Sequence, residues 1–170
     1  AVDNIAAWSG RISPDVVSVA NDSTFRKAKE SPEGAVFIVS HLGNVEITRA
    51  LLDDATRARL TILVHTKDAA HYNDVLRRYN PASALNTLQV TDIGPDTTIQ
   101  LQERIDRGDW VFIAGDRTPV GSQDRTTPAD FLGEEAPFAQ GPYILASLLN
   151  CPVYFMVCLR VGHGHELYVE

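Results

Sequence analysis

Cysteine is scarce in this sequence, and the scarcity restricts how the fold can be stabilised. The only two cysteines, Cys151 and Cys158, lie in one apolar segment. An extended strand would hold their α-carbons about 20 Å apart, at about 3.3 Å per residue. A disulfide needs less than about 7 Å between the α-carbons. We therefore predict two core thiols, which suits a reducing compartment.

An excess of basic residues is also missing. The formal net charge is -7, from 15 basic and 22 acidic side chains. A nucleic-acid-binding surface normally needs clustered Lys and Arg to meet the phosphates, so no nucleic-acid partner is predicted. The same balance argues against electrostatic attachment of the whole domain to anionic lipid.

Long apolar runs are absent too. The longest runs, such as residues 152–159, are far shorter than the roughly 20 residues that cross a bilayer. The first residues lack the charged start and apolar body of a signal peptide. Because the sequence begins and ends abruptly, we expect a domain excised from a longer protein, in which a membrane anchor can lie outside this chain.

Short apolar runs alternate with segments of helical periodicity. We predict strands at 35–40, 60–65, 88–90, 110–114, 152–159 and 167–169, and helices at 44–55, 68–79, about 99–107 and 142–149. Residues 115–128 are predicted to be a long polar loop, and residues 1–33 are an unassigned lead-in. The alternation predicts one α/β domain over residues 1–170, with a central mixed, largely parallel sheet and helices on both faces.

The segment Ser40–Glu46 is the strongest candidate site. His41 is expected at the carboxyl end of a buried strand, and Glu46 in the first turn of the next helix. A carboxylate that accepts from one imidazole nitrogen leaves the other free to take a proton from a hydroxyl. The bland alternative is a loop histidine, with Asn44 as a helix N-cap and Glu46 as a first-turn acid. The spacing alone does not decide between these readings.

Several motifs in order resemble one family. His41-Leu-Gly-Asn-Val-Glu46 resembles the His-x-Gly-Asn-x-Glu element of the lipid A late acyltransferases, which is their version of the His-x4-Asp/Glu motif of the glycerolipid acyltransferase superfamily. Similar downstream elements are the strand Trp110–Asp116, Arg125 before Pro128–Gly133, and the segments Ala136–Ala146 and Cys151–Phe155. The resemblance runs from about Gly34 to the end. Val45 departs from it, because the family commonly has tryptophan there.

The resemblance implies a glycerolipid acyltransferase-like fold and a direct acyl transfer. His41 would be the general base, Glu46 its orienting partner, and Asp116 a group that positions the site or the acceptor hydroxyl. The donor would be a thioester of acyl carrier protein or coenzyme A, and the acceptor a lipid A-like glycolipid at the cytoplasmic face of the bacterial inner membrane. Peripheral contact with that membrane is expected in the full-length protein, and neither a metal nor a cofactor is required.

Candidate substrate-binding residues are Asn44, Arg117, Arg125 and Phe131. Arginine suits an anionic group because its planar fork donates two hydrogen bonds at once. Alternatively, Asp116 to Pro119 is a β-turn with solvated arginines, and Phe131, Leu132 and Phe138 belong to the core. Two other functions also stay open: an ester or thioester hydrolase that uses the same His/Glu pair, and an inactive α/β binding module.

Overall fold

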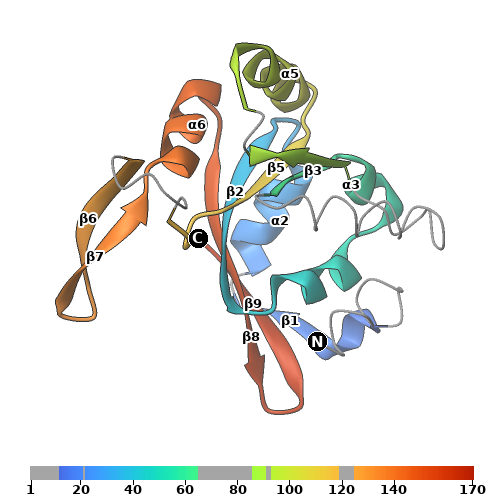
Figure 1. The fold of residues 1–170 in the computed structure, drawn as a ribbon. Coiled ribbons are helices and arrows are strands. Elements are labelled where there is room, and N and C mark those ends of the chain that lie inside the picture. The colour runs from blue at the N-terminus through green and yellow to red at the C-terminus, as the bar shows by residue number, and fades with distance from the viewer. Residues whose placement is uncertain (1–11, 21, 65–85, 91–92, 119–124) are drawn as a thin grey trace.

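Seven strands of the described chain form one sheet (Figure 1). The computed structural model describes residues 12–20, 22–64, 86–90, 93–118 and 125–170. Within them the strand order is β1-β9-β8-β2-β5-β3-β4, and every pairing is parallel except that of β8 with β9. The strands are β1 Val17–Val19, β2 Ala35–Gly43, β3 Leu60–Val64, β4 Asn86–Gln89, β5 Trp110–Ala114, β8 Val153–Val161 and β9 Gly164–Val169. The predicted mixed, largely parallel sheet is confirmed.

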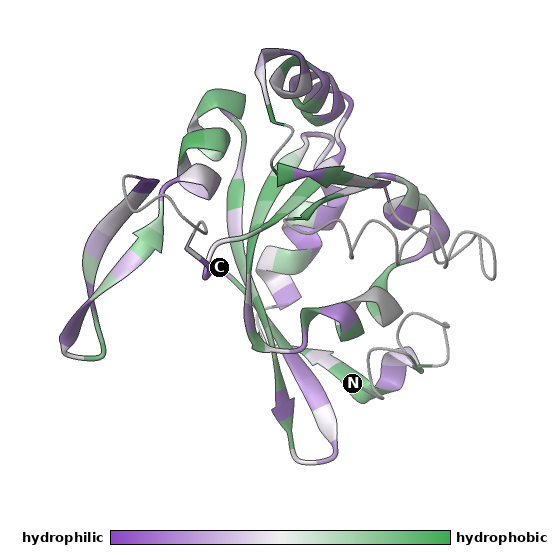
Figure 2. Cartoon of the chain, in the orientation of Figure 1, coloured by the Kyte–Doolittle hydropathy of each residue, from purple (hydrophilic) through white to green (hydrophobic). Residues whose placement is uncertain are grey.

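Helices pack on both faces of the sheet, as the sequence predicts. Alternate side chains of a strand point to opposite faces, and β2 feeds two separate cores. Ala35 and Phe37 join the core beneath α2 (Asp22–Glu30) and the short 3-10 helix η2 (Val45–Leu51). Val36 and Ile38 join the core beneath α5 (Pro95–Asp106) and α6 (Gly141–Leu149). The hydropathy colouring shows apolar residues concentrated along these central strands (Figure 2).

The single helix predicted over residues 44–55 is wrong. The chain instead forms η2 and then a separate helix, α3 (Asp54–Ala58). Asp53 lies between them in an extended conformation, and its carboxylate accepts the Thr56 N–H at 2.7 Å. Lys29 also pairs with Asp53 at 2.9 Å, and these hydrogen bonds hold the pKa of the Asp53 carboxyl far below its usual range. An N-cap of this kind starts a new helix rather than continuing an old one.

The polar loop predicted over residues 115–128 ends earlier than expected. Residues Thr126–Phe131 form β6, which pairs in antiparallel fashion with β7 (Glu134–Ala139) in a separate two-stranded sheet. Most of this hairpin is exposed on both faces, so it lacks the alternating apolar pattern that marks a half-buried strand. The turn residues Leu132 and Gly133 both have positive φ angles, as in a type I′ turn. Asparagine usually precedes the glycine in such a turn. Because leucine stands there instead, the sequence did not indicate a hairpin turn.

The unassigned lead-in contributes to the same sheet. The 3-10 helix η1 (Pro14–Val16) leads into β1, which pairs with β9, and α2 supplies Phe25 and Ala28 to the core. The remaining predicted strands agree with the structure, although several are longer than expected. The predicted helix at 68–79 lies outside the described residues. Both cysteines are free thiols; Cys158 is buried in the core as predicted, whereas Cys151 is only partly buried against it.

Phe37 connects the aromatic residues of the larger core. It is fully buried, and its ring centroid lies 4.8 Å from that of Trp110, 4.8 Å from that of Phe112 and 5.2 Å from that of Tyr154. We expect Phe37→Ala to lower the free energy of unfolding by about 3 to 5 kcal/mol, because it removes buried surface and leaves a cavity. The control Ile99→Ala, at an exposed position of α5, should change it by less than about 0.5 kcal/mol. Urea denaturation measures both, and equal effects would contradict this account of the core.

Candidate active site

The register of two neighbouring strands brings His41 beside Asp116. β2 and β5 are parallel, and Val39 pairs with Ala114 two residues before each of these side chains. The His41 backbone N–H donates to Asp116 Oδ2 at 2.6 Å, and His41 Nδ1 lies 2.9 Å from Asp116 Oδ1. Both oxygens of the carboxylate therefore bind the same residue. Asp116, which the resemblance assigned to the site, is therefore in direct contact with His41.

Two glycines allow the backbone to pass closely through this region. Gly43 has a φ of +77°, and an added Cβ would lie 2.0 Å from the Cys158 carbonyl oxygen in β8. The next residue, Asn44, donates its N–H to that same oxygen at 2.7 Å. At Gly115, an added Cβ would lie 2.5 Å from Ile38 Cγ2. Larger residues at either position would displace the segment that carries His41 or Asp116.

The hydrogen bonds between His41 and Asp116 determine which nitrogen of a neutral His41 ring carries the proton. Partial burial would raise the pKa of the Asp116 carboxyl, but the hydrogen bonds from the His41 ring and backbone N–H outweigh it and hold that pKa below the usual 3.8. An ionised carboxylate can only accept, so the proton of a neutral imidazole must sit on Nδ1. Nε2 is then left as the basic nitrogen. The His41 side chain is 53% exposed, which leaves the ring accessible to a substrate.

Glu46 lies in the first turn of η2, and its backbone N–H donates to Asn44 Oδ1 at 3.2 Å. This hydrogen bond is the N-capping interaction that the alternative, non-catalytic interpretation predicted for Asn44. In the structure, the carboxylate that binds His41 Nδ1 belongs to Asp116. From the sequence, Glu46 was expected to orient the ring. The signal for Asp116 was present in the sequence as a polar residue directly after a buried strand. Its partner became visible only with the strand order. Catalysis by Glu46 stays a prediction.

The other predicted residues are spread along the polar segment and the hairpin. Arg117 follows Asp116 and is exposed. Arg125 lies at the base of the hairpin, where its carbonyl oxygen accepts the Gln140 N–H at 3.0 Å. Phe131 lies near the hairpin turn and is 54% exposed, with its ring centroid 5.8 Å from that of Phe138. The core reading of Phe131 and Leu132 is therefore wrong, because the hairpin holds them away from the sheet. Substrate binding by Asn44, Arg117, Arg125 and Phe131 stays a prediction.

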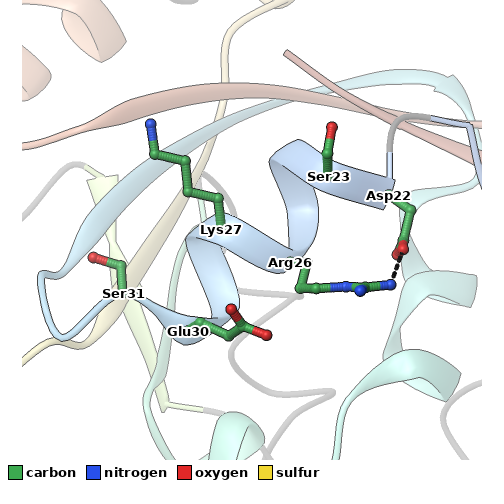
Figure 3. Close-up of a pocket in the computed structure, with 6 residues that line it drawn as sticks. All are labelled: Asp22, Ser23, Arg26, Lys27, Glu30 and Ser31. Atoms are coloured by element: carbon green, nitrogen blue, oxygen red, sulfur yellow. Dashed lines mark hydrogen bonds and ion pairs between the residues drawn. The ribbon is translucent and has the colours of Figure 1, made fainter.

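A surface hollow of about 590 Å³ runs along α2 (Figure 3). Its lining residues carry charges of both signs, and Arg26 pairs with Asp22 within it. They are Asp22, Ser23, Arg26, Lys27, Glu30 and Ser31. None of them is a predicted site residue, so this hollow does not alter the choice of the candidate site.

The fold and the histidine–carboxylate pair define a class of protein. It is the class of α/β proteins whose polar site lies at the carboxyl ends of adjacent parallel strands. The sequence matches the bacterial lipid A biosynthesis acyltransferase family over residues 3–170. The chain belongs to this family, and membership implies an enzyme that transfers acyl groups in lipid A synthesis. The match includes nearly all of the lead-in, where no resemblance was recognised. A search of curated proteins found no match.

Asp116 also predicts a pH dependence of stability. Its carboxyl has a lower pKa in the folded protein than the usual 3.8 expected after unfolding. The His41–Asp116 interaction therefore stabilises the fold fully above about pH 3.8. That stabilisation is lost as the pH falls through the lower pKa that Asp116 has in the folded protein. We expect Asp116→Asn to destabilise the protein at neutral pH, by an amount that shrinks on acidification. Urea denaturation across this pH range measures the difference.

The control is the same substitution in a His41→Ala background. Because the ring hydrogen bond is already absent there, Asp116→Asn should produce a smaller pH-dependent loss. A loss that is constant with pH, or equal in the two backgrounds, would show that the pair does not couple to folding.

Proposed function

We propose that this protein transfers a fatty acyl chain from a thioester of acyl carrier protein or coenzyme A to a hydroxyl group of a lipid A-like glycolipid, with His41 as the general base. The observation that carries the proposal is the double hydrogen bond between His41 and Asp116. It fixes the ring orientation and the tautomer, and these determine whether Nε2 can accept a proton. Family membership supplies the reaction class, and we propose the cytoplasmic face of the bacterial inner membrane as the place of action.

The proposed reaction is a direct transfer. His41 Nε2 takes the proton of the acceptor hydroxyl as its oxygen attacks the thioester carbonyl carbon. The tetrahedral intermediate collapses as the carbon–sulfur bond breaks. The departing thiolate then takes the proton back from the imidazolium, so the products are an ester and a free thiol, and the neutral histidine is restored. Asp116 stabilises the imidazolium that forms in between.

An acyl-enzyme on cysteine is a poor alternative. Burial raises the pKa of the Cys158 thiol to about 11, and burial also raises the pKa of Cys151. A thiol must ionise to become a strong nucleophile, and these thiols stay protonated at neutral pH. Direct attack by the acceptor hydroxyl avoids that requirement.

Substrate contacts follow from residue chemistry. We propose Arg117 and Arg125 for an anionic group of the acceptor or donor, since both are exposed and flank the segment that joins β5 to the hairpin. Asn44 lies three residues after His41, and we propose it as a polar contact to the substrate. Phe131 is proposed as an apolar contact for acyl chains. Glu46 is kept as a second carboxylate that assists His41.

A hydrolase of esters or thioesters would use the same histidine to activate water. Product analysis separates the two functions, because a transferase forms the new ester only when the acceptor is present. Free fatty acid formed at the same rate with and without acceptor would favour the hydrolase. An inactive binding module would bind acyl donor or acceptor without forming either product.

His41→Ala should abolish most acyl transfer while the fold is kept, because the side chain is half-exposed and contributes little packing. Loss of a general base typically lowers the rate by about 10² to 10⁴. Transfer assays on the folded variant, verified by circular dichroism, measure the effect. Undiminished turnover would end the proposal that His41 is the base.

The two carboxylates can be ranked by matched amide substitutions. Asp116→Asn keeps the shape of the side chain but removes the charge that holds Nδ1–H and stabilises the imidazolium. We expect it to lower kcat by about 10² to 10⁴ with a small change in KM. Glu46→Gln is the matched comparison and should lower kcat less. The reverse ranking would return the orienting role to Glu46.

A further inference from the structure

The tip of the β6–β7 hairpin carries two apolar side chains that are largely exposed. Phe131 is 54% exposed and Leu132 is 91% exposed. Leu132 also has a φ of +55°, which a bulky residue adopts at a conformational cost. In Figure 1 the hairpin extends away from the seven-stranded sheet, and its tip lies at the end farthest from α6. A strained leucine at so exposed a point lowers both stability and solubility unless something covers it.

We propose that this tip, Phe131-Leu132-Gly133, is a wedge that inserts into the surface of a lipid bilayer. The choice of a bilayer rests on the proposed function, because the acceptor of that reaction is a membrane lipid. In the described part of the chain, no helix is long and apolar enough to cross a membrane. A shallow wedge would give weak, reversible attachment and would bring the site to the lipid surface.

The size of the tip favours a bilayer over a protein partner. A stable protein interface buries about 800 Å² on each partner. Two apolar side chains at the end of a thin ribbon offer much less, and the strands behind them are mostly exposed on both faces. A deformable lipid surface can surround a narrow wedge, whereas a folded partner would need a matching pocket.

The charges behind the tip define which surface it can enter. Asp130 lies directly opposite Glu135 across the two strands, and Glu134 lies opposite Phe131. Like charges that face each other, as those of Asp130 and Glu135 do, destabilise a hairpin. This acidic collar (Asp130, Glu134 and Glu135) therefore does not stabilise the fold. It would remain at the level of the headgroups, where the ammonium groups of a zwitterionic lipid can approach it. Anionic lipid would be repelled.

The test is flotation of the full chain with vesicles of phosphatidylethanolamine and phosphatidylcholine, without donor or acceptor. The informative variant is Leu132→Asn. Asn-Gly is the preferred pair for a type I′ turn, so this change should keep or improve the hairpin while removing the apolar tip. We expect the variant to bind vesicles at least about tenfold more weakly than the native protein, because it no longer buries one leucine in the bilayer. Its melting temperature should equal or exceed that of the native protein.

The matched control is Ile99→Asn, which removes an apolar side chain that is 59% exposed on α5, away from the hairpin. It should bind vesicles as the native protein does. Added phosphatidylglycerol should weaken binding of the native protein. The proposal is overturned if the native protein does not float with vesicles, if Leu132→Asn floats equally well, or if anionic lipid strengthens binding. A change of oligomeric state in Leu132→Asn without vesicles would also overturn it, in favour of a second copy.

Acyl transfer separates this inference from the proposed function. Leu132→Asn should keep the native rate on a detergent-dispersed acceptor and lose rate on an acceptor embedded in vesicles. An inactive native protein that still binds vesicles through Leu132 would refute only the proposed function. An active protein that transfers equally to both forms of acceptor in both variants would refute only the wedge.

Discussion

The backbone hydrogen bonds of β2 join it to β5 on one side and to β8 on the other, and its residues from Ala35 to Ile38 are buried. β5 is buried to a similar depth on both faces, from Trp110 to Ile113. Because β2 and β5 are paired in register from Ala35–Trp110 to Val39–Ala114, the residues just beyond this paired segment must lie side by side. His41 and Asp116 are those residues. Their contact is a consequence of strand register, and it survives only while the core beneath it holds both strands.

The site is organised by the backbone as much as by side chains. Asp116 binds the His41 main chain with one oxygen and its ring with the other, so the carboxylate fixes both the position and the rotation of the imidazole. Gly43 and Asn44 fasten the other end of this segment to Cys158 in β8. If His41 is the base, as proposed, a ring held in this way would lose little entropy when an acceptor hydroxyl binds. The proposed wedge would complement this rigid centre with a peripheral contact that selects where the acceptor is found.

Prediction from the sequence succeeded where one face or both faces of an element are buried. The apolar run at 35–40 is a buried strand, as predicted. Leu101 and Ile105 of α5 face a core, although Ile99 of the same predicted helix is exposed. It failed where local hydrogen bonds or exposure decided the outcome. Asp53 divided an expected helix in two by capping Thr56. The exposed hairpin showed no periodicity, because a ribbon with solvent on both sides needs no apolar face. Asp116 was assigned to the site, but the carboxylate at the His41 ring was expected to be that of Glu46.

The sequence by itself determined the class of fold, the position of His41 near the end of a buried strand, and, through the order of its motifs, the family. These follow from hydrophobic periodicity and from short motifs, which are local in the chain. Only the tertiary structure decided that Asp116 is the residue at His41 Nδ1, because residues 75 positions apart meet through strand order. The exposure of Leu132 was likewise decided in three dimensions. Whether an apolar residue is covered depends on what packs against it, and no local pattern in the chain records that.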